Sequence, residues 1–220
     1  MATTLITGCS RGLGLALAAE FSKAGHLVFA TARGDPTPAL EELIKSSPST
    51  VKYIKLDATS RSSVQEAEKQ VAALLDGKGI DVLINNAGVI NWMTAGIHAM
   101  DDLDSVLSSN VTSAHIVTST FLPLLKRGAQ KKEQQWWFNR AVPCLRYHGN
   151  PSLQRFTFIA VNPGVRGASA DLDVETGAKA VVELIKSNGK ESNGKFLNIR
   201  VAGWEKNEGI NQYDGGVLPW

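Results

Sequence analysis

The sequence has little cysteine, no long apolar run and almost no excess of either charge. Its two cysteines, Cys9 and Cys144, are too few for a disulfide framework, and Cys9 stands in a glycine-rich turn where a disulfide would obstruct the backbone. We therefore expect reduced thiols in a cytoplasmic protein. No apolar run reaches the roughly 18 residues that span a bilayer. Residues 1–4 lack the charged region of a signal peptide, so no membrane partner is expected.

A net charge of +2 without any basic run gives no indication of a nucleic-acid partner. What the sequence does have is the composition of a globular protein, with 43% hydrophobic and 20% charged residues. Its 220 residues are enough for one domain with a full core, so we expect a single domain over 1–220.

Residues 7–14 read Thr-Gly-Cys-Ser-Arg-Gly-Leu-Gly and lie between an apolar strand and a helix-forming run. Glycines let the backbone turn tightly and approach a pyrophosphate, and the free N–H groups of the helix start face its negative charge. A helix over Leu13–Lys23 and a buried strand over His26–Ala32 complete a strand–helix–strand unit. The pattern favours dinucleotide binding; the alternative is a glycine turn that caps an ordinary helix.

Arg33 follows this second strand, at the place where NAD enzymes tend to carry an acidic residue for the adenosine ribose. An arginine there can accept a 2′-phosphate, and Arg11 in the glycine turn adds a second positive charge. The pattern therefore predicts NADP, with NAD less favoured. In the alternative interpretation Arg33 is merely solvated and Asp35 serves the ribose of NAD.

Apolar periodicity predicts the remaining elements. The expected strands are 51–57, 80–84, 156–161 and 195–200, and the expected helices are 39–45, 62–75, 101–126 and 175–187. Asp57 stands at the C-terminal end of its strand, where ligands bind in open α/β sheets. The simpler interpretation of residues 57–60 is a helix N-cap, and the two roles can coexist. Asn85-Asn86-Ala87-Gly88 follows the next strand.

The glycine pattern, Asp57, Asn85–Gly88 and the later Asn110 together resemble the short-chain dehydrogenase/reductase family. The resemblance is to its small fungal or bacterial NADP-dependent carbonyl reductase-like members, and it covers residues 1–126 and 156–220. It implies an α/β fold, a Rossmann-type doubly wound parallel sheet with helices on both faces. The implied function is an oxidoreductase that acts on a small carbonyl or alcohol.

The resemblance also implies site residues. The glycine turn would hold the pyrophosphate, Asp57 the adenine, and residues 86–88 the sugar on the nicotinamide side. The predicted cofactor-binding set is Gly8, Ser10, Arg11, Gly12, Leu13, Gly14, Arg33, Asp57, Asn86, Ala87, Gly88, Pro163 and Gly164. Asn110 would be catalytic, binding a water in a proton relay. In this family a helix such as 101–126 often forms a subunit interface. The resemblance is therefore compatible with a homo-oligomer that forms through this helix. No metal is implied.

The family's chemistry needs a tyrosine acid with a lysine four residues later, whose charge lowers the tyrosine pKa. None of the three tyrosines, Tyr53, Tyr147 and Tyr213, has a lysine at that spacing. An active enzyme would have to use Tyr147 or His148 instead, although a Tyr-His pair in a loop rich in glycine and proline is more often simply part of the surface. Two other interpretations stay open: a non-catalytic NADP-binding relative, and a damaged product that folds poorly.

Residues 127–155 are an aberrant segment, because they contain neither a β-branched run nor a helical apolar stripe. A strand could form around 141–145, but Pro143 argues against a central one. We therefore expect the region of the fifth strand to be disrupted. The abrupt change at both edges suggests an altered splice or reading frame over about 132–155.

Overall fold

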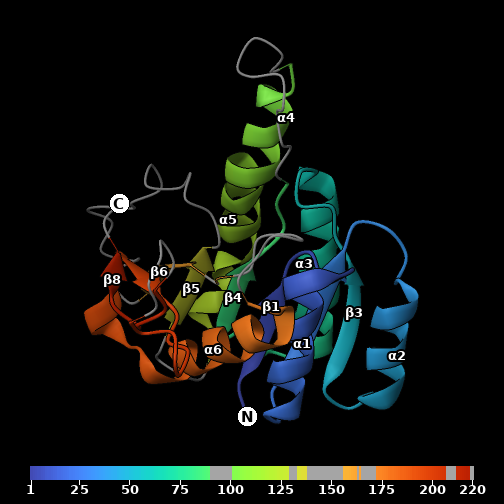
Figure 1. Cartoon of the computed structure of the whole chain (residues 1–220). Helices are drawn as coiled ribbons and strands as arrows, with labels where there is room; N and C mark the ends of the chain where they lie inside the picture. Colours follow the sequence, from blue (N-terminus) through green and yellow to red (C-terminus); the bar gives the residue numbers. More distant parts are fainter. Residues whose placement is uncertain are drawn as a thin grey trace.

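The computed structural model describes residues 1–89, 101–128, 133–137, 156–162, 164, 172–206 and 212–218 (Figure 1). The strands are β1 Thr3–Ile6, β2 Leu27–Ala32, β3 Val51–Lys55, β4 Val82–Asn85, β5 Glu133–Trp137, β6 Phe156–Asn162, β7 Lys195–Asn198 and β8 Val217–Leu218. The α-helices are α1 Gly12–Lys23, α2 Pro38–Ser46, α3 Arg61–Leu75, α4 Leu103–Leu107, α5 Ser113–Lys126 and α6 Val174–Ser187. A π-helical turn, Ser108–Thr112, joins α4 to α5, and a 3-10 turn covers Lys190–Ser192.

The strands form one sheet in the order β3-β2-β1-β4-β5-β6-β7-β8. All neighbouring pairs are parallel except β7 and β8, which are antiparallel. The chain winds outward from β1 to β3 and then returns to the other side of β1 with β4. This reversal confirms the predicted doubly wound parallel sheet, and it leaves a crevice beyond the carboxyl ends of β1 and β4.

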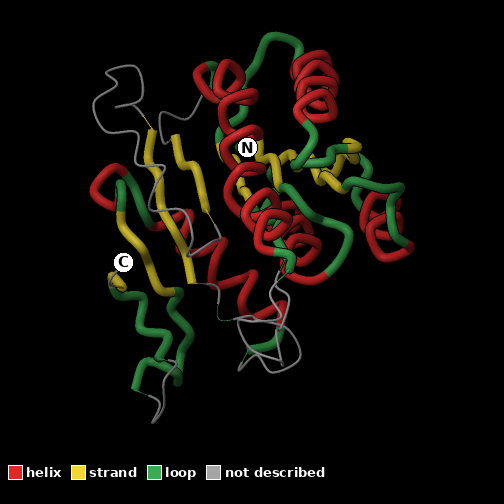
Figure 2. Tube along the Cα trace, turned by 90° about the horizontal axis from the view of Figure 1, so that it is seen from above, coloured by secondary structure: helices red, strands yellow, loops and turns green. Residues whose placement is uncertain are grey.

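Helices cover both faces of the sheet, as Figure 2 shows from above. One face carries α1, α2 and α6, whose apolar side chains form a core cluster with Ile6, Val28 and Ala30. The other face carries α3 and α5, which pack on Leu5 and Phe29. Alternate residues along β1 and β2 thus supply two separate cores, as expected for strands buried on both sides. Within the described part of the chain, no helix is long and apolar enough to cross a membrane.

The expected disruption of the fifth strand is wrong. β5 lies at Glu133–Trp137 and pairs in parallel with β4 on one side and β6 on the other, so the sheet is continuous. Main-chain groups make the ladder bonds, so a strand held between two neighbours does not need β-branched side chains. The weaker expectation of a strand at 141–145 lies outside the described residues.

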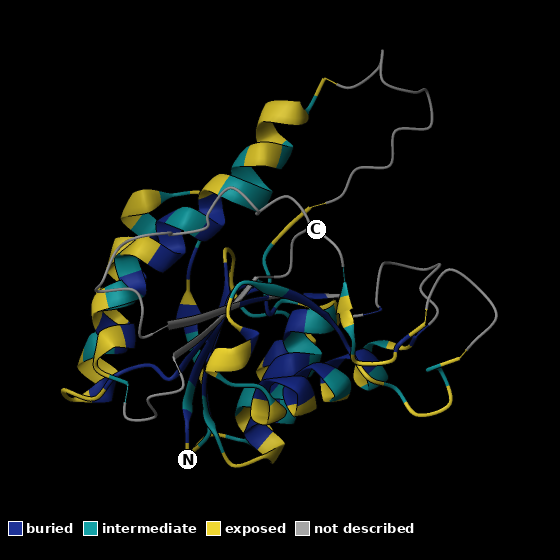
Figure 3. Ribbon diagram, turned by 90° about the vertical axis from the view of Figure 1, so that its left-hand side faces the viewer, coloured by how far each residue is buried: buried dark blue, intermediate teal, exposed yellow. Residues whose placement is uncertain are grey.

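The predicted helix over 101–126 is a single helical run with a π-helical turn inside it. Its C-terminal half buries Ala114, Val117 and Phe121 against the sheet, as the apolar stripe predicts. The N-terminal half of that stripe is not buried: Leu103 and Leu107 are 50% and 44% exposed. Figures 1 and 3 show this end of the helix standing clear of the sheet with exposed and half-buried residues around it.

His26 ties the start of β2 to the start of the chain. Its Nδ1 accepts a hydrogen bond from the Ala2 backbone N–H at 3.1 Å, and its ring meets Phe21 edge to face. Partial burial lowers the pKa of His26 from its ordinary value of 6.5, and the positive charge of Lys186 on α6 lowers it further. The folded state therefore holds His26 neutral, because a protonated Nδ1 could not accept this hydrogen bond.

We expect the free energy of unfolding to decrease as the pH falls below about 6.5. The pKa of His26 is lower in the folded than in the unfolded chain, so the unfolded chain binds more protons in that window and acid favours it. The contribution is fully present at neutral pH and is lost on acidification. Urea midpoints at pH 7.5 and 5.5 measure this for the wild type and for His26→Phe, which keeps an aromatic ring but cannot titrate. An equal pH dependence in both proteins would contradict the assignment.

Candidate functional site

A cleft of about 630 Å³ opens beyond the carboxyl ends of β1, β2, β3 and β4. This volume falls within the range of about 300–1,000 Å³ that is usual for small-molecule sites. Eleven of the predicted cofactor-binding residues line it: Gly8, Ser10, Arg11, Gly12, Leu13, Gly14, Arg33, Asp57, Asn86, Ala87 and Gly88. The structure therefore brings together residues from four separate stretches of sequence. Their roles as cofactor contacts remain predictions.

The glycine turn is held between the two strands that flank β1. The Thr7 N–H donates to the Ile84 carbonyl at 2.9 Å, and the Cys9 N–H donates to the Thr31 carbonyl at 2.7 Å. Gly8 has φ +75, a backbone conformation that favours glycine. A Cβ added to Gly14 would lie 2.2 Å from the Gly8 carbonyl oxygen, so the start of α1 contacts the turn at a distance that only glycine permits.

Thr7 and Asn86 join this turn to the end of β4. The Thr7 hydroxyl accepts hydrogen bonds from the backbone N–H groups of Asn86 and Ala87, both at 3.0 Å. In return, the Asn86 side-chain amide donates to the Thr7 and Gly8 carbonyls at 2.9 and 3.2 Å. The amide of Asn86 thus positions the turn and closes the floor of the cleft between β1 and β4.

Two arginines lie at the rim of the cleft. Arg11 is the N-cap residue of α1, has extended backbone and makes no side-chain cap bond. Arg33 lies in the loop that follows β2, and both side chains belong to exposed residues. Among the described residues, neither guanidinium forms an ion pair. Together with the N-terminus of the 12-residue helix α1, they give this side of the cleft the character of an anion site.

Asp57 lies opposite, two residues after β3 ends. Its Oδ1 accepts from the backbone N–H of Thr59 at 2.9 Å and from the Thr59 hydroxyl at 2.7 Å. Its own N–H donates to the Ser63 hydroxyl at 2.9 Å. The N-cap of α3 is Ser60, which accepts from the Ser63 N–H. The N-cap expected within 57–60 is therefore confirmed at Ser60, and Asp57 with its fixed carboxylate lines the cleft.

Asn110 lies in the π-helical turn and contacts the chain just past Gly88. Its side-chain oxygen accepts from the Val89 N–H and its amide donates to the Val89 carbonyl, both at 2.8 Å. This two-point contact fixes the segment that leaves β4, and π-helical turns occur frequently at functional sites. The predicted role of Asn110 in a proton relay remains a prediction.

Gly164, another residue of the predicted site, is not among the described residues that line the cleft. Gly164 has φ +66, and its carbonyl lies 3.5 Å from the Tyr213 hydroxyl in a buried contact. Pro163 lies outside the described residues.

Cys9 is fully buried, with Sγ 3.2 Å from the Ile6 carbonyl, and burial raises the pKa of its thiol to about 12. The thiol is therefore no nucleophile in the folded chain.

Thr7 and Thr37 line the cleft and Tyr53 supports it, and local sequence patterns assign none of them this role. Thr7 belongs to the glycine motif, but its bonds to Asn86 and Ala87 span about eighty residues of sequence. Thr37 caps α2 and donates from its hydroxyl to the Ser10 carbonyl at 2.7 Å; the Thr-Pro pair signals only the cap. Tyr53 donates to carbonyls of the Arg33 loop, and no local pattern indicates that contact.

The chain is similar to known proteins over more than half of its length. The profile of the family described as short chain dehydrogenase matches residues 2–133. An uncharacterized oxidoreductase of Schizosaccharomyces pombe is 30% identical over an alignment of 262 positions that covers both chains completely. That alignment is longer than this chain, so the yeast protein has residues that this chain lacks.

The NADPH-dependent pterin aldehyde reductase of Arabidopsis thaliana is 37% identical over 130 residues, which cover 56% of this chain and 50% of that protein. This chain likewise spans only half or less of the length of several other curated relatives. Among solved structures, the NADPH-bound carbonyl reductase from chicken fatty liver superposes with a TM-score of 0.78 at 21% identity. The superposition covers 100% of this chain and 94% of the chicken protein, and this likeness shows the fold.

Proposed function

The chain belongs to the short-chain dehydrogenase family, and from this premise we propose that it is an NADP-dependent oxidoreductase that acts on a small carbonyl or alcohol. The observation that carries the proposal is the cleft, in which a glycine turn, a helix N-terminus and two exposed arginines lie together at the reversal of a doubly wound sheet. We propose that the whole chain forms the nucleotide-binding domain.

The described residues fit NADP. The missing side chain at Gly14 lets the glycine turn pack against α1, and the open space around Gly12 leaves room for a pyrophosphate at the start of that helix. Arg11 and Arg33 offer guanidinium groups to a 2′-phosphate, which NAD lacks. On the opposite wall, Asp57 would accept from the adenine amino group. Asn86–Gly88 would lie along the nicotinamide-side sugar.

When bound, the cofactor would supply or accept the hydride at the substrate carbon. Reduction of a carbonyl also requires a proton at the substrate oxygen, which the chain or a water must deliver. We propose that this proton transfer takes place beside the segment that leaves β4. Asn110 would position that segment through its contact with Val89.

Two of the three tyrosines are poor candidates for the proton donor. Tyr53 donates to the Arg33 loop, and burial together with the charge of Asp35 raises its pKa, which weakens it as an acid. Tyr213 is buried against Gly164. We therefore propose that Tyr147 or the neighbouring His148, outside the described residues, delivers the proton.

A second candidate function is binding of NADP without turnover. One observation favours it: no tyrosine of the sequence has a lysine four residues later. A turnover assay with a panel of small aldehydes and ketones separates the two candidates, since both predict the same binding of NADPH. If the wild type oxidises NADPH and Tyr147→Phe or His148→Ala abolishes this oxidation, the chain is an enzyme. If the wild type binds NADPH to saturation without oxidising it, the chain binds NADP without turnover.

We further propose contacts between copies of the chain through residues 101–126, because Leu103 and Leu107 expose apolar side chains on α4. A cytoplasmic location is proposed from the cysteine content, since Cys9 is a free buried thiol in a turn that leaves no room for a disulfide.

Thermal unfolding with and without cofactor tests the proposed binding. We expect NADPH to raise the melting temperature more than NADH does, and a ligand at about 100 times its Kd adds about 2.7 kcal/mol of stability. Arg33→Ala should remove most of the difference between the two cofactors. Arg61→Ala, which removes an exposed arginine on α3 that does not line the cleft, is the matched control. Equal shifts with NADPH and NADH in the wild type would contradict the preference for NADP, and no shift at all would contradict binding.

A further inference from the structure

The loop that carries Arg33 is contacted by two side chains of β3 and by the glycine turn. Ala32, Arg33, Gly34 and Asp35 all line the cleft between the end of β2 and the start of α2. Arg33 is exposed, so its own side chain makes little contribution to holding the loop. A guanidinium recognises a phosphate only if its backbone is held where the two can meet. The position of Arg33 therefore depends on the contacts that hold the backbone of this loop.

Tyr53 holds the loop on both sides of Arg33. Its hydroxyl lies 3.3 Å from the Ala32 carbonyl and also contacts the Gly34 carbonyl, so a single O–H is shared between the residues before and after the arginine. The ring of Tyr53 packs against the core cluster under α2, which leaves the hydroxyl little freedom to move. β3 is the edge strand of the sheet and lies directly beside β2.

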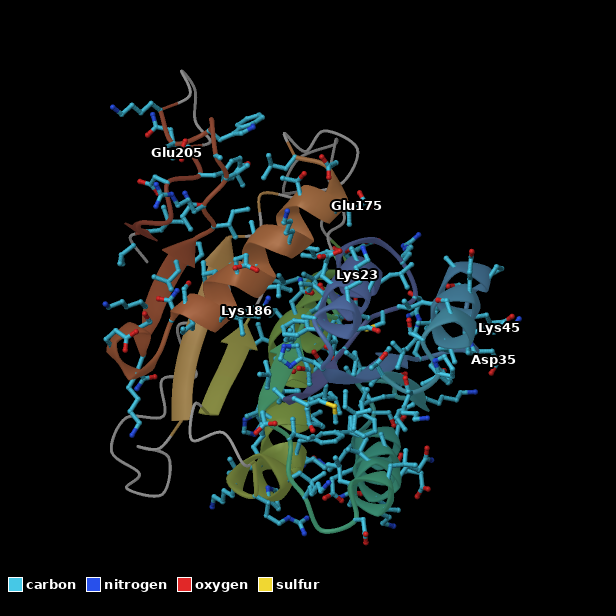
Figure 4. The ribbon with its side chains drawn as sticks, turned by 90° about the horizontal axis from the view of Figure 1, so that it is seen from below. Lys23, Asp35, Lys45, Glu175, Lys186 and Glu205 are labelled. Carbon is cyan, nitrogen blue, oxygen red and sulfur yellow. The ribbon has the colours of Figure 1, made fainter. Side chains whose placement is uncertain are left out.

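Lys55 acts on the same loop from the same face of β3, because residues two apart in a strand point to one side. Its ammonium pairs with the Asp35 carboxylate at 3.7 Å, with the two side chains 63% and 94% exposed. Figure 4 shows Asp35 at the outer edge of the molecule beside α2. An unpaired Asp35 would repel a 2′-phosphate and would suit the 2′-hydroxyl of NAD. Its pairing with Lys55 removes part of that charge from the cleft rim.

The far end of the loop is anchored separately. Thr37 donates its hydroxyl to the Ser10 carbonyl at 2.7 Å, and the Cys9 N–H donates to the Thr31 carbonyl. The loop therefore stays attached to the glycine turn at both ends when Tyr53 is altered. Removal of the phenol hydroxyl releases only the backbone around Arg33.

We propose that edge strand β3 sets the preference for NADP over NAD, with Tyr53 as the residue that positions Arg33 and Lys55 as the residue that neutralises Asp35. The inference rests on the proposed function, because it concerns the same cleft and the same cofactor. It assigns a role to two side chains that do not themselves line the cleft.

The first test measures the Kd of NADPH and of NADH for the wild type, Tyr53→Phe, Arg33→Ala and the double variant, by titration calorimetry. Tyr53→Phe should weaken NADPH binding on the order of tenfold and change NADH binding less than about twofold. In the Arg33→Ala background the same substitution should have no further effect, because the residue that it positions is absent. Tyr213→Phe, which removes another backbone-bound tyrosine hydroxyl, should leave the ratio of the two constants unchanged.

The second test uses the ion pair, whose exposed side chains can be changed without disturbing the core. Lys55→Ala should lower the preference for NADPH a few-fold at low salt, and added Asp35→Asn should restore it. Salt of about 0.5 M should reduce the effect of Lys55→Ala, because exposed charges are screened over a few ångströms there. If Tyr53→Phe does not fold, this pair of variants still tests whether β3 influences the preference for NADPH over NADH.

The outcomes separate the inference from the function on which it rests. A wild type without preference for NADPH overturns the proposed cofactor. A wild type that prefers NADPH, together with an unchanged ratio in folded Tyr53→Phe or an additive loss in the double variant, overturns the role of Tyr53. A Lys55→Ala variant whose ratio does not depend on Asp35 overturns the role of the ion pair.

Discussion

Replacement of Gly14 by alanine is expected to weaken binding of NADPH on the order of a hundredfold. The new Cβ would lie 2.2 Å from the Gly8 carbonyl oxygen and 2.5 Å from the Asn86 side-chain nitrogen. Neither neighbour can move freely: Gly8 has φ +75 and packs on Ala87, and the Asn86 amide holds the Thr7 and Gly8 carbonyls. The glycine turn must therefore separate from α1.

The size of the expected loss follows from this separation. A displacement of about 1 Å in a positioned site costs on the order of a hundredfold, and a clash within a packed region costs roughly 1–3 kcal/mol of stability. Titration with NADPH measures the first effect and urea unfolding measures the second. Both should appear in Gly14→Ala, because the same contact joins the start of α1 to the phosphate turn.

Gly25→Ala is the matched control, because Gly25 follows the other end of α1. Its φ of +78 makes a side chain costly there by about 1–2 kcal/mol, but no atom lies within 4 Å of the new Cβ. We expect this variant to lose stability and to keep its affinity for NADPH. Binding of NADPH by Gly14→Ala with the affinity of the wild type would contradict the role of the glycine turn.

The contrast between these glycines illustrates what the sequence can predict. Gly25 is recognisable as a helix stop from its place after a periodic apolar run, and the structure confirms this with φ +78. Helices α3 and α6 are likewise predicted to within a residue or two, because the apolar spacing along each helix is a local signal. The cleft also follows from sequence, since the ends of parallel strands meet at one edge of a sheet.

Contacts between distant segments are what the sequence does not reveal. The fifth strand forms at Glu133–Trp137 because two neighbouring strands offer their backbone groups to it, and this influence is absent from the local residue pattern. In the same way, the hydroxyl of Tyr53 meets the Arg33 loop across about twenty residues of sequence. The apolar stripe that continues to Leu103 and Leu107 predicts burial, but the structure places no described element over them.

Gly79 marks the contact that holds β4 against α5, and its replacement by alanine should cause the largest loss of stability outside the cleft. A Cβ on Gly79 would lie 2.1 Å from both the Arg127 carbonyl carbon and the Gly128 nitrogen. These are backbone atoms, which cannot rotate away as a side chain can. Gly128 is equally confined, since its Cβ would lie 2.5 Å from the Ile80 carbonyl oxygen.

We expect Gly79→Ala to lower the free energy of unfolding by about 3 kcal/mol or more, at the upper end of the usual cost of overpacking. The hydrogen bond from the Ile80 N–H to the Leu124 carbonyl, now 3.1 Å, would be lost as the helix end moves away. Because β4 leads into Asn86 and α5 follows Asn110, the same movement should also weaken NADPH binding. Urea unfolding and cofactor titration measure the two effects.

Gly77→Ala separates steric contact from backbone strain in the same connection. Gly77 has φ +82 but no atom within 4 Å of an added Cβ, so its replacement costs only the left-handed conformation, about 1–2 kcal/mol. Gly79 has no positive φ, so any larger loss in Gly79→Ala comes from the approach of α5 to β4. Equal losses in the two variants would mean that the helix end yields to the new methyl group. That outcome would contradict the expectation that the close approach at Gly79 limits the stability of this connection.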